Sequence, residues 1–192
     1  MSEPQDHRAR RRADTHRRIY LAAMRLFQEQ GYESVTVAHI AAASRVSVPT
    51  FYDHFPSKDH LIMAVPPQEQ LAELLRAQPV DLPLADRMRG MILAFLADLG
   101  PGARADVLTR WRIVAGTPHL RRRAAEFERM TAEMVLTALG AESGGGAPSA
   151  ARVVVTATFS AYTEALLRWV ESGGDESLAE VTDEILAVLR GL

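Results

Sequence analysis

Apolar side chains recur along most of this chain at intervals of three and four residues, which is the period of an α-helix with one buried face. The first such stripe consists of Ile19, Ala22, Ala23, Leu26 and Phe27. It predicts a helix from Asp14 or Thr15 to Gln30, after which Gly31 is suited to the C-cap. No segment shows the alternation typical of a β-strand, so the pattern predicts an all-α fold of about nine helices.

Two very short helices are predicted within residues 40–55, joined by a tight turn. Thr36 is a good N-cap for the first helix, and Ser44-Arg45-Val46 forms the corner. Ser47 then caps the second helix, in which Pro49 is tolerated because it lies in the first turn. This arrangement is a helix-turn-helix, a motif whose second helix can lie in the major groove of DNA.

The second of these helices has two different faces. Its inner face, directed at the first helix, is expected to hold Val46, Phe51 and Phe55. The other face is left with Val48, Thr50, Tyr52 and His54.

Further helices fill the rest of the chain. Lys58, the only lysine, lies at the start of the next one, an unusual place for a cation unless an anion is close. Pro66-Pro67 interrupts this helix, because proline removes a backbone hydrogen bond. The last two predicted helices cover residues 150–171 and 177–189.

Composition excludes several classes of protein. No apolar run has membrane-spanning length and no secretory signal is recognisable, and cysteine is absent, so a cytoplasmic protein without membrane contact is expected. The histidines are scattered, and no local motif assembles a catalytic, metal-binding or cofactor-binding site. We therefore expect neither an enzyme nor a metal or cofactor protein.

Charge is divided unevenly along the chain. Residues 1–60 hold 9 Lys+Arg against 7 Asp+Glu, and residues 61–192 hold the remaining 13 against 17. The first 13 residues are expected to form a disordered basic arm. This arm is either a solvated tail or a segment that follows phosphates or enters a minor groove. Arg17 lies in the first turn of the first predicted helix, where nearby phosphates would compensate for the unfavourable helix dipole.

Many positions of the N-terminal region resemble the signature of the TetR family of transcriptional regulators. They are Thr36, Ile40-Ala41, Val46-Ser47, Thr50-Phe51-Tyr52, His54-Phe55, Ser57-Lys58 and Leu61. The resemblance implies a three-helix DNA-binding head, residues 14–62, on a ligand-binding and dimerising helical-bundle body, residues 63–192. In that family the body dimerises through its last two long helices, and the partner is double-stranded DNA with a palindromic operator.

Carried over position by position, the resemblance makes Ser47–His54 the recognition helix. The positions of Thr36, Tyr52, His54 and Lys58 match those that hold phosphate or sugar, and Val48, Pro49 and Thr50 match those that face base edges. The pattern departs from the family at Ser44-Arg45, where Ala-Gly is common. An arginine in a left-handed turn costs roughly 1 kcal/mol relative to glycine, which a contact of Arg45 with DNA would offset. The expected DNA-binding residues are Arg17, Thr36, Arg45, Ser47, Val48, Pro49, Thr50, Tyr52, His54 and Lys58.

The body resembles a narrower group of regulators with an acyl-CoA-like ligand-binding domain, including mycofactocin-associated ones. The resemblance rests on residues 110–121, Arg168-Trp169 and Gly173-Gly174-Asp175. It implies a small-molecule effector, whose identity the sequence does not reveal. Aromatic and methionine side chains at helical spacing usually belong to the core, and some are expected to line a pocket between bundle helices. The residues expected to bind the effector are Phe95, Trp111, Met130, Met134, Phe159 and Tyr162.

The sequence therefore predicts a homodimeric, ligand-responsive DNA-binding regulator, a repressor released from its operator by an effector. One alternative is an activator of the same fold. Another is a helical small-molecule-binding protein with a vestigial helix-turn-helix, which would have no need for Thr36, Tyr52, His54 and Lys58 together.

Overall fold

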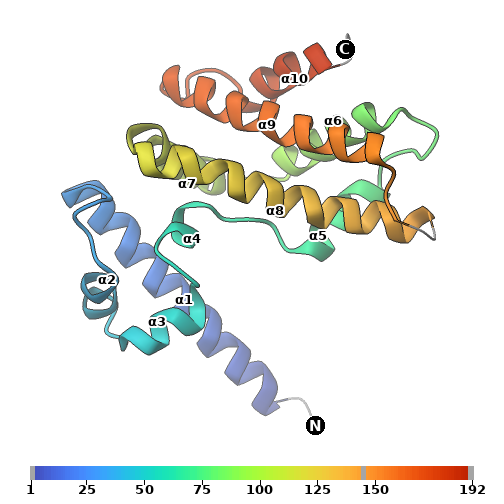
Figure 1. The fold of residues 1–192 in the computed structure, drawn as a ribbon. Helices are drawn as coiled ribbons and strands as arrows, with labels where there is room; N and C mark the ends of the chain where they lie inside the picture. Colours follow the sequence, from blue (N-terminus) through green and yellow to red (C-terminus); the bar gives the residue numbers. More distant parts are fainter. Residues whose placement is uncertain (1–2, 144–145, 190–192) are drawn as a thin grey trace. The chain divides into compact units, whose positions relative to one another are not determined.

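Helices account for all the regular secondary structure in the computed structural model, which describes residues 3–143 and 146–189 (Figure 1). The chain forms two compact units, Met1–Ala64 and Val65–Leu192. Within the described ranges there are ten helices: α1 (Glu3–Gln30), α2 (Val37–Ala43), α3 (Val48–His54), α4 (Asp59–Ile62), α5 (Gln68–Arg76), α6 (Leu84–Ala97), α7 (Pro101–Gly116), α8 (Pro118–Ser143), α9 (Ser149–Glu171) and α10 (Leu178–Val188). The all-α prediction is confirmed, and the expected count of about nine is exceeded by one. Pro66-Pro67 separates α4 from α5, which are two helices rather than one interrupted helix.

The first unit packs α1, α2 and α3 around a small apolar core. Ile19 of α1, Ile40 of α2 and Phe51 of α3 are fully buried, and Leu61 of α4 is nearly so. Each comes from the apolar stripe of its own helix, so burial of these stripes fixes the three helices against one another. α2 and α3 are only seven residues each, and such short helices depend on this tertiary packing for their stability.

The basic arm is the clearest difference from expectation. α1 begins at Glu3 rather than at Asp14 or Thr15, so the described part of the segment that we expected to be disordered is helical. Alanine and arginine are good helix formers, and extending an existing helix by one residue costs little. A tertiary contact also holds the extension, since the Arg12 side chain donates a hydrogen bond to the backbone carbonyl of Asp53 (2.9 Å).

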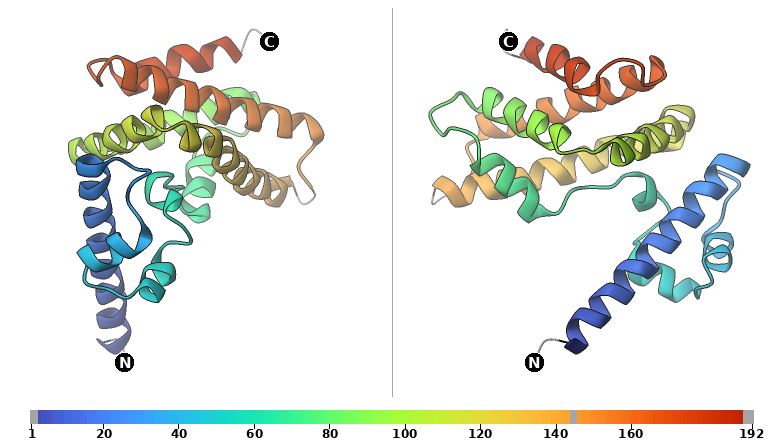
Figure 2. Two further views of the ribbon diagram at one scale, coloured as in Figure 1. Left: turned by 60° about the vertical axis from the view of Figure 1, so that its left-hand side comes forward. Right: turned by 180° about the vertical axis from the view of Figure 1, so that it is seen from behind.

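The second unit is a bundle in which α9 lies between α8 and α10, as all three views of Figures 1 and 2 show. α6 packs on α9 and α10, and α7 packs on α8 and α9. Trp169, Val155 and Leu166 of α9 are buried in the core of this unit. None of the helices in the described ranges has both the length and the apolar composition that a membrane span requires.

Two helix boundaries in the chain lie elsewhere than the local signals suggested. α8 continues through Gly140 to Ser143, although glycine is a common residue at the end of a helix. Ser57 does not cap α4 with its hydroxyl group, which instead bonds to Nδ1 of His60 (2.8 Å). In both places a local preference worth about 1 kcal/mol does not by itself decide where the helix begins or ends.

Candidate functional site

The corner between α2 and α3 is a Schellman motif, in which two backbone N–H groups bond back into the preceding helix. Arg45 N–H donates to the Ala42 carbonyl (3.1 Å) and Val46 N–H donates to the Ala41 carbonyl (2.9 Å). The left-handed position that the motif usually gives to glycine is held by Arg45, with a φ of 54°. The predicted left-handed arginine is therefore present, and its side chain is exposed.

Both predicted N-caps are confirmed. The Thr36 hydroxyl oxygen accepts a hydrogen bond from His39 N–H (3.2 Å), and the Ser47 oxygen accepts one from Thr50 N–H (3.1 Å). The hydroxyl groups of Ser47 and Thr50 also bond to each other (2.7 Å), which fixes the direction of both side chains at the start of α3. Each cap satisfies one of the N–H groups that a helix start leaves without a partner.

Four side chains of α3 and its C-cap lie on the faces that the sequence predicted, whereas Val46, Thr50 and His54 are half-buried. Phe51 and Phe55 are buried, whereas Tyr52 is 53% exposed and Val48 is 38% exposed. Pro49, in the first turn of α3, is also exposed. Large apolar and aromatic side chains thus remain in solvent on a very short helix, where they do not contribute to the core of the unit. Such a surface is suited to contact with thymine methyl groups and sugars.

His54 differs from the other residues predicted for the DNA-facing surface because its ring lies against α1. The rings of His54 and His16 are 5.8 Å apart, and His16 stacks on Phe55 at 4.1 Å. Nδ1 of His54 is shielded from solvent without a hydrogen-bond partner. Burial, followed by the nearby charge of Arg12, lowers the pKa of His54, and Asp53 partly opposes this shift. A phosphate contact of His54 stays a prediction, whereas its visible contacts hold α3 to α1.

Lys58 is also engaged within the unit. Its ammonium group donates to the backbone carbonyls of Tyr32 (2.8 Å) and Val35 (3.0 Å), and it lies 4.0 Å from the centroid of the Tyr32 ring. The Tyr32 hydroxyl group donates to the Asp59 carboxylate. Burial lowers the pKa of Lys58, while Glu33 and Asp59 act in the opposite direction. These contacts attach the start of α4 to the segment that leads into α2.

Sequence reasoning missed Arg12, which fixes α1 to the end of α3. A signal was present, because Arg12 lies seven residues before Ile19 and four before His16, on the same face of α1. Arg17 is exposed on α1, and its contact with DNA stays a prediction.

The predicted effector-binding residues are only partly brought together in the body. Phe159 is buried in its core, and Phe95, Trp111, Met134 and Tyr162 pack against that core while remaining partly accessible. Burial raises the pKa of the Tyr162 phenol, and the charge of Arg110 acts in the opposite direction. Met130 does not join this group: it is 43% exposed, at the edge of the buried stripe of α8. Within the described ranges no group of acidic, histidine or cysteine side chains is arranged to hold a metal ion.

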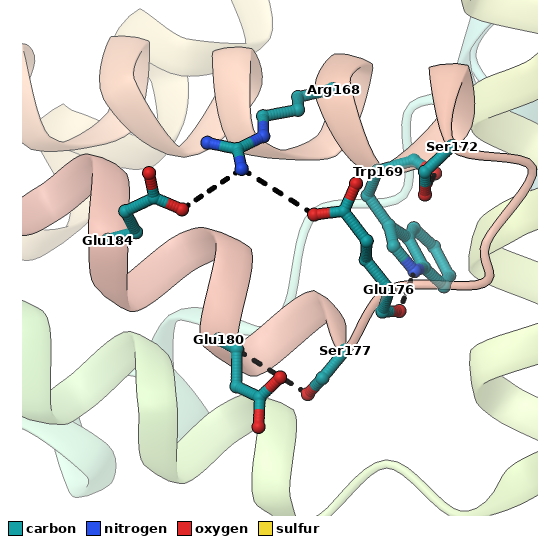
Figure 3. A network of polar contacts seen from close by, with 7 residues as sticks. All are labelled: Arg168, Trp169, Ser172, Glu176, Ser177, Glu180 and Glu184. Atoms are coloured by element: carbon teal, nitrogen blue, oxygen red, sulfur yellow. Dashed lines mark hydrogen bonds and ion pairs between the residues drawn. The ribbon is translucent and has the colours of Figure 1, made fainter.

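The turn between α9 and α10 is held by a polar network (Figure 3). Arg168 pairs with Glu184 (3.0 Å) and Glu176 (3.5 Å), and the Trp169 indole N–H donates to the Glu176 carbonyl (2.9 Å). Ser177 caps α10. The same turn is attached to α7, because the Arg112 side chain donates to the Gly173 carbonyl (2.7 Å). The two helices predicted to form a dimer interface are therefore fixed to each other.

Comparison with known families gives two matches that divide the chain between them. Residues 19–65 match the family model described as "Bacterial regulatory proteins, tetR family". Residues 82–191 match the model described as "MftR C-terminal domain".

Individual relatives agree with these matches. The chain is 32% identical over 136 residues to the HTH-type transcriptional regulator TcmR of Streptomyces glaucescens. This match covers 66% of this chain and 58% of TcmR. It is 41% identical over 58 residues to the HTH-type transcriptional regulator Rv0767c of Mycobacterium tuberculosis, and this match spans 30% of the chain and 27% of that relative's length.

A solved structure extends the similarity to the whole fold. FadR of Thermus thermophilus, described as a TetR family transcriptional repressor in complex with lauroyl-CoA, superposes with a TM-score of 0.50. The match covers 91% of this chain and 92% of FadR at 23% identity, so it shows a shared fold.

Proposed function

This chain belongs to the TetR family of bacterial regulatory proteins, and from that premise we propose that it is a homodimeric repressor which a small-molecule effector releases from a palindromic operator. As a transcriptional regulator with a DNA-binding helix-turn-helix, it is a member of a non-enzymatic family. We further place it in the cytoplasm, where a bacterial regulator meets its operator.

The exposed face of α3 carries the proposal for operator binding. Phe51 and Phe55 are buried and hold α3 against the core of the first unit. Val48, Pro49 and Tyr52 therefore lie on a fixed surface rather than on a mobile loop. The capped starts of α2 and α3 add backbone N–H groups at which phosphate oxygens are favoured. These features support base contacts from the start of α3 and a phosphate or sugar contact from Tyr52.

Operator binding is tested with Tyr52→Ala, with Tyr52→Phe as the matched control. A duplex selected by the intact protein from a random-sequence pool serves as the probe in fluorescence anisotropy. Because Tyr52 is largely exposed, the alanine variant should unfold like wild type but bind about tenfold or more weakly, and the phenylalanine variant should show whether the ring or the hydroxyl group makes the contact. Equal affinity of Tyr52→Ala and wild type across a salt series contradicts the assignment of Tyr52.

The proposed dimer uses α9 and α10. One side of α9 presents Val153, Thr156 and Ser160 at helical spacing to solvent, and Val153 is 70% exposed. On α10, Val188 is 66% exposed. Small and apolar exposed side chains on two helices that are already fixed to each other support an isologous interface between two copies.

An acyl-CoA-like effector is the ligand that we propose for the body. The support is the partly accessible aromatic side chains that pack against the core (Phe95, Trp111 and Tyr162), the match to the MftR C-terminal domain, and the shared fold with a repressor whose structure contains lauroyl-CoA. Thermal denaturation with and without lauroyl-CoA tests this, since a ligand that binds only the folded state raises its stability. An unchanged midpoint at high ligand concentration excludes this ligand and leaves the DNA-binding proposal intact.

Release from DNA follows from geometry. Two recognition helices bind consecutive major grooves only when they are separated by about 34–36 Å, one turn of the DNA helix. An effector that binds more tightly to a dimer with another separation shifts the population away from the DNA-binding state, by no more than the difference between its two affinities.

A further inference from the structure

The N-terminal half of α1 carries an unusually dense set of positive charges. Between residues 7 and 18 there are six arginines and a single acidic residue, Asp14. All six arginines are exposed: Arg8, Arg10, Arg11, Arg12, Arg17 and Arg18. A basic tail of this kind is ordinarily a solvated, disordered segment, but here it is part of a continuous helix.

Contacts at two consecutive turns hold this helix to the recognition helix. Arg12 donates a hydrogen bond to the Asp53 carbonyl, in the last turn of α3 (2.9 Å). One turn further along α1, the His16 ring stacks on Phe55, the C-cap of α3 (4.1 Å). The direction of α1 relative to α3 is therefore fixed at the end of α3.

Arg8 extends this arrangement beyond α3. It lies four residues before Arg12, on the same face of α1 and about 6 Å further along its axis. Arg8 therefore lies one turn of α1 beyond Arg12, the residue that contacts the end of α3, and on the same face as that contact. Figures 1 and 2 show the N-terminal part of α1 projecting beyond α3.

We propose that residues 7–12 form a second DNA-contacting element, a fixed basic helix whose Arg8 and Arg11 bind phosphates flanking the base pairs that α3 covers. The major groove is about 12 Å wide, so a cation one turn past a helix in that groove lies near the strand that borders it. A guanidinium group matches a phosphate with two parallel hydrogen bonds. This inference rests on the binding of α3 to DNA.

The helical state of the extension also decides between the two kinds of contact expected for a basic arm. An α-helix with its side chains is about 10–12 Å across, whereas the minor groove is only about 6 Å wide. The helix therefore does not enter the minor groove. Phosphates at its edge are the groups within reach of the arginines.

The test compares two duplexes that share the operator selected by the intact protein. The short duplex contains the selected palindrome alone, and the long duplex adds about ten base pairs, one turn of DNA, on each side. Binding is measured by anisotropy over a salt series for wild type and for Arg8→Ala/Arg11→Ala. Alanine preserves helix propensity, which far-UV circular dichroism checks. Arg25→Ala is the matched control, because Arg25 lies on the same helix, is exposed and is paired with Glu29 (3.9 Å).

Wild type and Arg25→Ala should bind the long duplex at least about tenfold more tightly than the short one, and Arg8→Ala/Arg11→Ala should bind both almost equally. The slope of log K against log salt on the long duplex should fall by about 0.9 for each phosphate that the double variant no longer binds. Arg12→Ala should reduce the preference for the long duplex although Arg8 and Arg11 remain, because it removes the attachment to α3.

Two results would overturn the inference: a wild-type protein that does not distinguish the duplexes, or a double variant that retains the full preference and salt slope. If the intact protein selects no duplex at all, this result refutes the proposed binding of α3 to DNA instead. The two failures are therefore distinguishable.

Discussion

At the scale of single residues, Lys58 has a structural role within the first unit, whereas the sequence suggested only a contact with DNA phosphate or sugar. Its ammonium group is bonded to the carbonyls of Tyr32 and Val35, which lead into α2. Thr36, the cap of α2, follows directly. A substitution of Lys58 that weakens DNA binding would therefore act in part by displacing Thr36 and the start of α2.

We predict that Lys58→Ala lowers the free energy of unfolding of the first unit by about 1–2 kcal/mol, since it removes two hydrogen bonds from a partly buried charged donor. Urea denaturation measures the difference. Lys58→Met is the control that keeps the aliphatic stem. A midpoint equal to that of wild type would show that the two carbonyl contacts contribute nothing.

His16 and His54 give the first unit a predicted dependence on pH. Burial is the main cause that lowers the pKa of each below its ordinary value of 6.5, and Arg12 adds to the effect on both. For His16 the charge of His54 also contributes. Between the folded and unfolded pKa values the unfolded chain binds more protons, so stability increases with pH in that window and is fully present above about pH 6.5.

Urea denaturation at a series of pH values should therefore show stability falling as the pH drops below about 6.5. Replacing both histidines by glutamine should flatten this dependence, because the groups that gain protons on unfolding are removed. His39→Gln, on the exposed side of α2, is the control and should leave the dependence unchanged. If the double variant keeps the wild-type slope, other groups are responsible.

At the scale of elements, the turn after α9 is fixed by two glycines with positive φ, Gly173 (73°) and Gly174 (85°). They differ in their surroundings. A Cβ atom on Gly174 would lie 2.6 Å from Cδ2 of Leu108 in α7, whereas the nearest atom to a Cβ on Gly173 is 4.0 Å away. Gly174 therefore allows α7 to approach the end of α9, and Gly173 only allows the turn.

We predict that Gly173→Ala costs about 1 kcal/mol of stability from backbone strain alone. Gly174→Ala should cost about 2–4 kcal/mol, because overpacking against Leu108 is added to the strain. The matched pair isolates the contact between α7 and α9. Leu108→Ala should recover part of the stability in the Gly174→Ala background, as measured by a double-mutant cycle. If both alanine variants lost the same free energy of unfolding, the close approach of Gly174 to Leu108 would contribute nothing to stability.

At the scale of the whole molecule, dimer formation through α9 and α10 is the prediction on which operator binding depends, because a palindrome is read by two heads. Sedimentation equilibrium at micromolar concentration should give twice the mass of the 21.1 kDa chain. Val153→Glu should shift the equilibrium toward monomer, since it places a charge in an apolar contact. Val80→Glu is the control, because Val80 is 78% exposed and lies outside α9 and α10. A wild-type monomer under these conditions would refute the dimer.

Much of the first unit could be predicted because its signals are local. The caps at Thr36 and Ser47 act over three residues, and the left-handed Arg45 stands where the TetR family commonly has glycine. The buried and exposed faces of α3 also follow from helical spacing. In the body, the apolar spacing identified helices, but it could not separate Met130, at the surface, from Phe159, in the core. Both positions carry the same kind of side chain at a compatible spacing.

The sequence by itself determined the all-α fold, the caps of α2 and α3 and the helix-turn-helix, since these depend on interactions between residues three to five positions apart. Only the tertiary structure decided that Lys58 bonds to carbonyls 26 and 23 residues away, and that Arg12 reaches a carbonyl 41 residues away. It also showed that the basic segment is helical. A hydrogen bond between distant segments forms only after the apolar core has placed them side by side, so no local pattern records which donor meets which acceptor.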